Sequence, residues 1–350
     1  MWILLTGLIF GLGAVLLVAQ GNPGNYGFCA ACHLRDIAGA LGLHKAGTLQ
    51  YARPEILGII LGAAVMAAFR GEHRVRGGSK PMIRFLLGMV MMIGALAFLG
   101  CPLRGILRLA GGDLNGLTGL AGFASGIGVG IWFLKRGYNL GRSHSLANSN
   151  WKPVGYVTPV AAAVLAVLVF VGGAGVLAFS KSGPGSMHAP ILMSLAFGLL
   201  AGVAAQKTRM CLSGGIRDFI LVRDTYLLKI YGVLFLAALA GNLAFGFFKL
   251  GFEAQPLAHT MHLWNFLGLM LVGLAATLAG GCPLRQLIQA GEGNLDAAAC
   301  VLGMLAGAAV AHGLNTAGSP AGLAWNGQVA VAAGLVVTAA IGYLHCKEAV

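Results

Sequence analysis

Four of the seven cysteines stand in two motifs that each occur twice along the chain. The motif GCPLR contains Cys101 and returns 181 residues later with Cys282, and a cysteine followed six residues on by Arg-Asp occurs at Cys29 and Cys211. A buried thiol is a weak hydrogen-bond donor and a soft acceptor that demands little hydration. Four thiols at matched positions therefore predict a path for a solute with a soft sulfur-like or selenium-like end. Simple packing of small residues is the alternative.

The stretch from Cys29 to His33 also has the CxxCH spacing of a c-type haem attachment site. The second copy of this motif has Gly214 and Gly215 where Cys32 and His33 stand in the first, whereas the cysteine and the Arg-Asp pair recur. We therefore expect no covalent haem, no other cofactor and no metal site. A thiol redox or persulfide relay through Cys29 and Cys32 stays open as an alternative function.

The GCPLR motifs predict chain breaks at which a cysteine caps a short helix. Pro102 and Pro283 fit the first helical position, where the missing N–H group loses no hydrogen bond. The free N–H groups and the positive dipole end of each short helix would then point at the cysteine, which favours an anion. Arg104 and Arg285 follow in the first turn, where they would offset further negative charge. Their alternative partners are backbone carbonyl groups or the acidic residues Asp113, Asp296 and Glu292.

Two motifs repeated at nearly the same interval indicate two homologous halves, residues 1–135 and 189–325. Residues 136–188 form a linker with one membrane span, and residues 326–350 form a final span. Because a single span separates the halves, the second is expected upside down relative to the first, an inverted repeat with its site near the midplane. Each half is expected to hold four spans and two short helices. These short helices are predicted near 30–42, 102–110, 211–222 and 283–290.

The composition requires a membrane protein, since 58% of the residues are hydrophobic and only 9% are charged. Apolar stretches long enough to cross about 30 Å of hydrocarbon as helices recur along the chain. The predicted fold is an all-α polytopic membrane protein of about ten spans, the first of which lacks a basic leader and is expected to stay uncleaved. The spans are predicted near 3–20, 54–69, 82–100, 115–134, 157–179, 190–206, 228–249, 262–281, 295–314 and 325–345.

The formal net charge of +13 is distributed as membrane topology requires. Three connections on one side of the ten-span order are rich in Lys and Arg: 70–84, 135–152 and 207–229. The connections on the other side carry one lysine between them: 180–189, 250–261 and 315–324. Basic connections stay cytoplasmic, so both termini are expected inside the cell membrane, and the charge needs no nucleic-acid partner. No phosphate-binding GxxxxGK[ST] loop occurs that would couple the chain to ATP.

Resemblance to a known family rests on three stretches: GNPGNYGFCAACHLRDIAGALGLH, GCPLRGILRLAGGDLN and GCPLRQLI. They resemble the YeeE/YedE sulfur-transport family, in particular its selenium-metabolism-associated YedE branch. The resemblance extends over nearly the whole chain and implies an hourglass-like membrane protein that takes up thiosulfate, with successive cysteines as hydrogen-bonding stations. Carried over by motif, these stations are Cys29, Cys101 and Cys282, to which we add Cys211 as the repeat partner of Cys29. The branch implies a selenium compound as an alternative cargo.

The sequence therefore predicts a permease, not an enzyme, for a small sulfur- or selenium-containing oxyanion. Its partners would be this solute, the lipid bilayer and a cytoplasmic sulfur- or selenium-carrier protein, but no nucleic acid. A non-transporting anchor for a sulfur- or selenium-handling enzyme is the remaining alternative. The predicted path residues are Cys29, Cys101, Cys211 and Cys282. The predicted supporting residues are Pro102 and Pro283 at the breaks, Arg104 and Arg285 beside them, and the pairs Arg35–Asp36 and Arg217–Asp218 near the two mouths.

Overall fold

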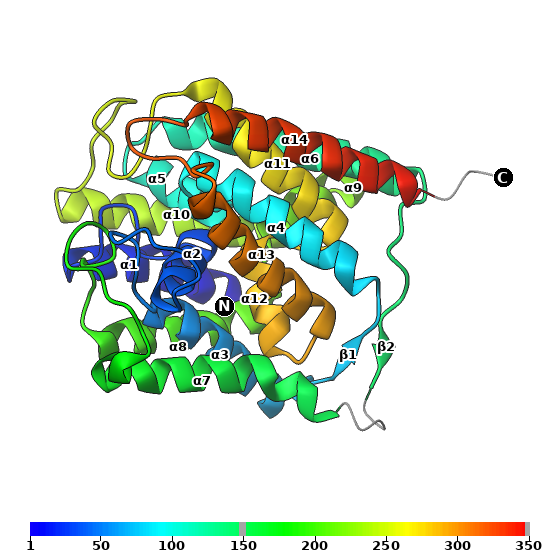
Figure 1. The fold of residues 1–350 in the computed structure, drawn as a ribbon, viewed down its shortest axis with the longest axis horizontal. Helices are drawn as coiled ribbons and strands as arrows, with labels where there is room; N and C mark the ends of the chain where they lie inside the picture. The colour runs from blue at the N-terminus through cyan, green and yellow to red at the C-terminus, as the bar shows by residue number, and fades with distance from the viewer. Residues whose placement is uncertain (147–151, 347–350) are drawn as a thin grey trace.

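The computed structural model describes residues 1–146 and 152–346, and nearly all of its regular structure is helical (Figure 1). Nine helices in these described ranges are long and apolar enough to cross a membrane, and the shorter apolar helix α3 stands in the position of a tenth. The predicted class, an all-α polytopic membrane protein of about ten spans, is therefore confirmed. The long helices and α3 are α1 (Trp2–Ala19), α3 (Pro54–Phe69), α4 (Pro81–Phe98), α6 (Asn115–Lys135), α7 (Val157–Phe170), α8 (Ile191–Thr208), α10 (Tyr226–Ala244), α11 (His262–Ala279), α13 (Leu295–Gly313) and α14 (Trp325–Leu344).

Four shorter helices lie among these spans, close to their predicted positions. They are α2 (Ala30–Ala40), α5 (Pro102–Ala110), α9 (Leu212–Val222) and α12 (Pro283–Gly291). The spans before three of them end on a residue with left-handed backbone conformation, which stops the helix and turns the chain. These residues are Leu99 after α4, Arg209 after α8 and Gly280 after α11. The remaining elements are two 3₁₀ turns, η1 (Lys152–Tyr156) and η2 (Gly172–Gly175), and the antiparallel two-residue strands β1 (Arg76–Gly77) and β2 (His144–Ser145).

The packing between the two halves occurs in exchanged pairs. We match α1 to α6 in order with α8 to α13, so that α1 corresponds to α8, α3 to α10, α4 to α11 and α6 to α13. The contact between α3 and α8 then corresponds to the contact between α10 and α1. In the same way, the contact between α4 and α13 corresponds to the contact between α11 and α6. A two-fold relation between the halves would produce this pattern. The inverted orientation of the halves in a membrane remains a prediction.

Two glycines at helix crossings show the same correspondence between the halves in their individual atomic contacts. A Cβ added to Gly122 on α6 would clash with the carbonyl oxygen of Phe266 on α11, and one added to Gly303 on α13 would clash with that of Phe85 on α4. Each residue of the first contact lies 181 positions from its counterpart in the second, which is also the spacing of the GCPLR motifs. Small residues at such crossings let helix backbones approach closely, as is common in membrane proteins.

The short helices α5 and α12 begin at the two GCPLR motifs and end on connections of the opposite half. The end of α5 binds the 250–261 connection, because Lys249 N donates to Gly111 O and Gly251 N donates to Gly112 O. The end of α12 binds the 70–84 connection, because Arg74 N donates to Glu292 O. These two connections were assigned to opposite sides of the membrane by their charge. The contacts are therefore consistent with short helices that run from the middle of the protein toward opposite faces.

Candidate functional site

The predicted path cysteines lie at the N-termini of the four short helices, one at each N-cap position. Cys29 Sγ accepts hydrogen bonds from Cys32 N at 3.3 Å and from Cys101 N at 3.4 Å, so the first half brings its two predicted path cysteines, Cys29 and Cys101, together. In the second half, Cys211 Sγ lies 3.9 Å from Cys282 Sγ. The structure thus gathers the four cysteines into two pairs, each within one half.

The local electrostatics of each pair favours a negatively charged guest. The thiols stand where two helices begin, so backbone N–H groups that have no partner within the helix and the positive ends of two dipoles converge on them. In the second half, Cys211 Sγ already accepts a hydrogen bond from Gly214 N at 3.3 Å and contacts Ser213 Oγ at the same distance. Helix N-termini in proteins bind anions by this arrangement. The two pairs can therefore hydrogen-bond a small anion and partly offset its charge.

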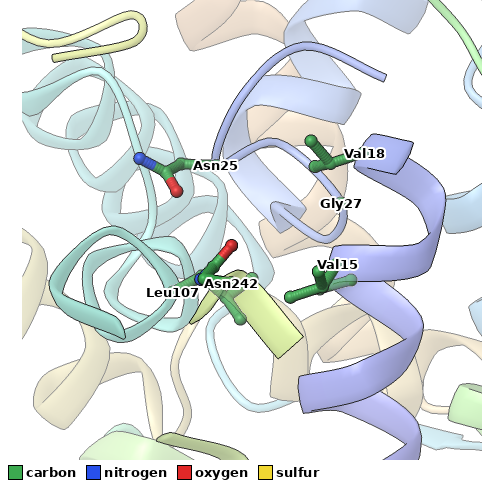
Figure 2. A pocket seen from close by; sticks show the side chains of 7 residues that line it. Val15, Val18, Asn25, Gly27, Leu107 and Asn242 are labelled. Carbon is green, nitrogen blue, oxygen red and sulfur yellow. The ribbon is translucent and has the colours of Figure 1, made fainter. Parts of the chain in front are cut away.

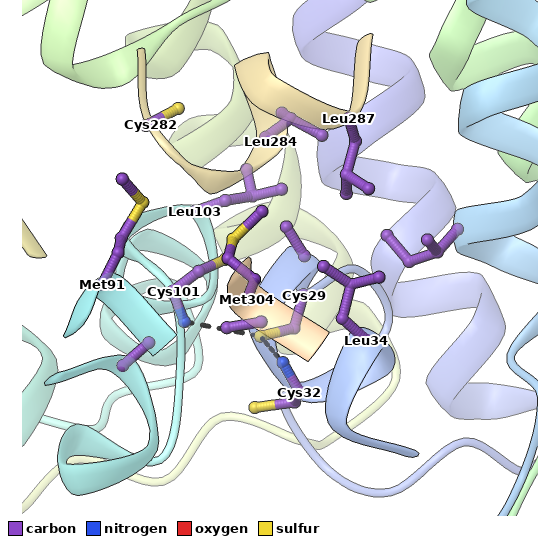
Figure 3. Packing of buried hydrophobic residues seen from close by; sticks show 14 of the residues in the cluster. Cys29, Cys32, Leu34, Met91, Cys101, Leu103, Cys282, Leu284, Leu287 and Met304 are labelled. Carbon is purple, nitrogen blue, oxygen red and sulfur yellow. Dashed lines mark hydrogen bonds between the residues drawn. The ribbon is translucent and has the colours of Figure 1, made fainter. Parts of the chain in front are cut away.

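Buried apolar side chains pack in one cluster with the path cysteines. Leu103, Leu284 and Met304 belong to the same buried cluster as the four cysteines, and in the view of Figure 3 they are drawn between Cys282 and Cys29. Leu103 and Leu284 are the leucines of the two GCPLR motifs, so each half contributes the same residue to this cluster, and we call these two residues the leucine plug.

A cavity of about 240 Å³ reaches the second cysteine pair from the side of the basic connections. Three arginines, Arg209, Arg217 and Arg285, line it together with Cys211. Arg217 pairs with Asp218 at 2.8 Å, but both side chains remain about one-third exposed. Arginines at the wall of a concave site raise the local concentration of anions. The predicted mouth residues Arg217 and Asp218 thus line an open vestibule.

The corresponding pair in the first half is sealed. Arg35 binds Asp36 at 2.7 Å, and their side chains are 6% and 0% exposed. Tyr26 Oη donates to Asp36 at 2.8 Å, and Arg53 Nε donates to the same carboxylate at 2.9 Å. Arg53 also donates to the carbonyl oxygens of Pro184 (2.6 Å) and Met187 (3.0 Å), both in the 180–189 connection. The predicted mouth at Arg35 is therefore closed by a buried ion network and by the connection above it.

The arginines of the two GCPLR motifs have different partners. Arg104 is buried and donates to the carbonyl oxygens of Asn25 and Leu99, and its Nη1 lies 3.7 Å from Cys32 Sγ. Arg285 lines the vestibule and donates to Glu292 at 3.2 Å. The alternative partners considered from the sequence, carbonyl groups and Glu292, are thus present. Only Arg285 of the two also faces the cavity.

Sequence reasoning missed Arg53, Tyr26 and Arg209 as parts of this site. A charged residue beside an apolar span is a functional signal, and Arg53 directly precedes the Pro54 that begins α3. Arg209 likewise stands two residues before Cys211 and bridges Glu72 and Glu292 at the rim of the vestibule. Tyr26 gave no signal that distinguishes it from a packing residue.

A second cavity lies between α1, α5 and α10, beside Val15, Asn25 and Asn242 (Figure 2). Its volume is about 10 Å³, which is room for about one water molecule. It does not reach the four cysteines through any lining residue, so a solute path through it is not supported.

The fold and the paired thiols define a class, an integral membrane protein with broken helices that meet near its centre. Residues 207–344 match the family model described as sulphur transport, the kind of family that the sequence motifs resemble. The thiosulfate transporter TsuA of Escherichia coli (strain K12) is 31% identical over 107 residues, which are 31% of this chain and 30% of that protein. The TsuA of Spirochaeta thermophila is 31% identical over 103 residues, 29% of this chain and 31% of that protein. The matched segment thus covers about a third of each curated relative.

Proposed function

We propose that the protein is a permease for a small sulfur-containing oxyanion, with thiosulfate as the first candidate and a selenium compound of similar chemistry as the second. The observation that carries the proposal is the pairing of four cysteines at four helix N-termini, two in each half. The transporters among the curated relatives support the same class of activity and no enzymatic one.

The chemistry of the pairs suits such an anion. A dianion that leaves water must replace the hydrogen bonds that it loses, and an unsatisfied charge in an apolar interior is very costly. Backbone N–H groups at the four helix starts and the thiol hydrogens supply donors, while the soft sulfur atoms tolerate the large terminal sulfur of thiosulfate. Arg209, Arg217 and Arg285 would collect the anion in the vestibule before or after its passage.

The unequal mouths support a mechanism with alternating access. The vestibule at Cys211 is open, the pair at Arg35 is sealed, and Leu103 and Leu284 are buried in one cluster with the four cysteines. In the proposed cycle, the seal of the first half opens while the vestibule closes, and the leucine plug shifts as the short helices move. The basic connections would face the cytoplasm, where they could also bind an acidic sulfur-carrier protein.

The second candidate function is a thiol relay, favoured by the 3.9 Å between Cys211 Sγ and Cys282 Sγ. Two thiols at this distance need a shift of about 2 Å to form a disulfide bond. In such a relay the pair would exchange disulfide or persulfide sulfur with a partner and would not move the intact anion.

Uptake of ³⁵S-thiosulfate by the purified protein in liposomes tests the proposal. The parent protein is expected to show saturable uptake, and Cys101→Ala and Cys282→Ala to lose most of it while eluting as folded protein. Cys300→Ala is the matched control, because Cys300 is also buried but lies on α13 outside the two pairs. Absence of uptake by the parent, together with a disulfide trapped between Cys211 and Cys282, would favour the relay.

A further inference from the structure

One buried carboxylate behind the vestibule is shared by three arginines. Glu292 Oε1 accepts hydrogen bonds from Arg285 Nη1 at 3.2 Å and from Arg209 Nη1 at 3.3 Å. Its Oε2 lies 3.9 Å from Arg76 Nη2. The Glu292 side chain is 4% exposed, and its partners come from three separate segments: β1, the end of α8, and α12. Glu292 is therefore the centre of a basic cluster and not one half of a simple ion pair.

Two cavities adjoin at this cluster. Arg209 and Arg285 line the vestibule, and Arg76 lines a second cavity of about 300 Å³. The two cavities have two lining residues in common, so they lie next to each other. Glu292 lines neither of them. A solute in either cavity therefore meets Glu292 only through the arginines that it binds.

Two positive charges of the cluster have no acidic partner of their own. Arg209 also binds Glu72 at 2.8 Å, and Glu72 in turn binds Arg70 at 3.0 Å. Four arginines thus share two carboxylates, Glu72 and Glu292. The other arginines that line the two cavities are matched one to one: Arg217 with Asp218 and Arg84 with Asp296. The excess equals the charge of thiosulfate or of a similar divalent oxyanion.

Arg285 keeps hydrogen-bond donors for a guest in the vestibule. It uses Nη1 for Glu292, whereas its Nε and Nη2 make no hydrogen bond with any residue that the structure describes. A guanidinium group carries five N–H donors in a planar fork and can bind two acceptors at once. An oxyanion in the vestibule would therefore bind an arginine that Glu292 already holds.

We propose that Glu292 competes with the transported oxyanion for Arg209 and Arg285, and so sets how tightly the vestibule holds the anion. In the empty vestibule the carboxylate occupies both arginines. When the anion binds, its charge and that of Glu292 repel each other across the arginines that they share. A site on a conduction path must bind its solute well enough to receive it and weakly enough to release it. The inference rests on the proposed transport of an oxyanion.

The strength of arginine–anion contacts makes such a competitor necessary. Hydrogen bonds between ionised groups are about twice as strong as neutral ones, and arginine can bind an oxyanion through two parallel bonds. Two arginines without a competing acid would hold a divalent anion in a half-closed cavity and release it slowly. Glu292 offers these arginines a second partner, so the bonds that the anion gives up on leaving are replaced at once.

The first half lacks this competitor. Gly111 stands at the repeat position of Glu292, 181 residues earlier. Arg104, the counterpart of Arg285, is 1% exposed and donates to backbone carbonyl groups, with no carboxylate within ion-pair distance in the described part of the chain. An anion at the first cysteine pair would therefore meet an arginine that no acid claims. We expect the vestibule to be the weaker of the two anion sites.

The test measures binding separately from transport. The purified protein is titrated with ³⁵S-thiosulfate by equilibrium dialysis, and initial uptake is measured in liposomes. Glu292→Gln keeps the size of the side chain but removes the competing charge, so we expect it to bind thiosulfate about tenfold more tightly than the parent. Its maximal uptake rate should fall several-fold, because release becomes slow.

Two further variants keep the test interpretable. Glu292→Asp retains the negative charge but withdraws it by one methylene group, so it should show a smaller shift in the same direction if Glu292→Gln does not fold. Glu253→Gln removes an exposed carboxylate from the 250–261 connection and should behave like the parent.

The outcomes distinguish competition from a structural role. If Glu292 only held α12 to the 70–84 connection, its loss would lower both affinity and rate. A folded Glu292→Gln protein that binds thiosulfate no more tightly than the parent would overturn the inference, while uptake by the parent would leave the transport proposal intact. Tighter binding with an unchanged maximal rate would overturn the role in release. A parent that neither binds nor takes up thiosulfate would overturn both proposals.

Discussion

At the scale of single residues, the chemical question is why cysteine stands at each short-helix start. Serine caps a helix N-terminus better than cysteine does, so helix stability alone does not explain the choice. Cys29 and Cys211 accept capping hydrogen bonds through sulfur, whereas the side chains of Cys101 and Cys282 make no cap bond. The thiols of Cys101 and Cys282 therefore do not stabilise the helix start by a capping hydrogen bond, the one structural role in which serine could replace them.

The first prediction concerns Cys101→Ser. We expect this variant to retain the thermal stability of the parent but to lose about tenfold in thiosulfate uptake, because a contact worth about 1 kcal/mol or more to the dehydrated anion is altered. Sulfate uptake should not rise to compensate. The measurement is initial uptake in liposomes together with the unfolding temperature. Cys300→Ser is the control, and uptake equal to the parent by Cys101→Ser would show that the thiol acts only as a donor.

The second prediction concerns the vestibule arginine Arg217, whose side chain is 35% exposed. Arg217→Gln should raise the thiosulfate concentration for half-maximal uptake several-fold at low salt, since it removes a charge that attracts the anion. The difference should shrink at high ionic strength, where such attraction is screened. Arg142→Gln removes an exposed arginine that does not line the vestibule and should leave the curve unchanged. If both variants gave the same thiosulfate concentration for half-maximal uptake, Arg217 would not take part in attracting the anion.

At the scale of helices, the two halves pack together at helix crossings where only glycine fits. The third prediction is that Gly122→Ala and Gly303→Ala both lower the unfolding temperature, and by similar amounts, because each added methyl group would meet the carbonyl oxygen of an equivalent helix. Gly128→Ala is the control on α6, since nothing lies within 4 Å of its added Cβ. This change should stabilise the helix by about 0.5–1 kcal/mol. Unequal losses at Gly122 and Gly303 would argue against equivalent crossings.

The sequence was sufficient to predict the elements, because each has a local cause. Pro102 and Pro283 mark helix starts, and each of the ten apolar stretches contains a helix. The span predicted at 157–179 is too long, because α7 ends at Phe170 and a 3₁₀ turn follows at Gly172–Gly175. The pairing of Cys29 with Cys101, and the plug of Leu103 and Leu284, were not predictable, because they depend on how distant segments meet. The difference between the open vestibule at Arg217 and the sealed pair at Arg35 was not predictable for another reason. A single sequence is compatible with every conformation that the chain adopts, whereas the structure is one of them.

At the scale of the whole molecule, orientation is the property that function depends on most. The fourth prediction is that Arg74 lies inside the cell and Ser319 outside, because of the uneven charge of the connections. In a Cys346→Ser background, a membrane-impermeant maleimide applied to intact cells should label Ser319→Cys but not Arg74→Cys. Both substituted positions are exposed, whereas the neighbouring Ser79 is buried against Asp296 and unsuitable. Labelling of both from outside would contradict the proposed topology.

The bonds from Arg53 to Pro184 and Met187 make the 180–189 connection the cover of the first half. Three side chains of this connection are exposed: Lys181, Ser186 and Met187. A large molecule can therefore bind the connection at the protein surface. An antibody fragment raised against this loop should hold the cover in place and arrest transport from the extracellular side. Such a reagent would inhibit from a site outside the proposed solute path. Its inhibitory potency would depend on how often the 180–189 connection moves away from Arg53.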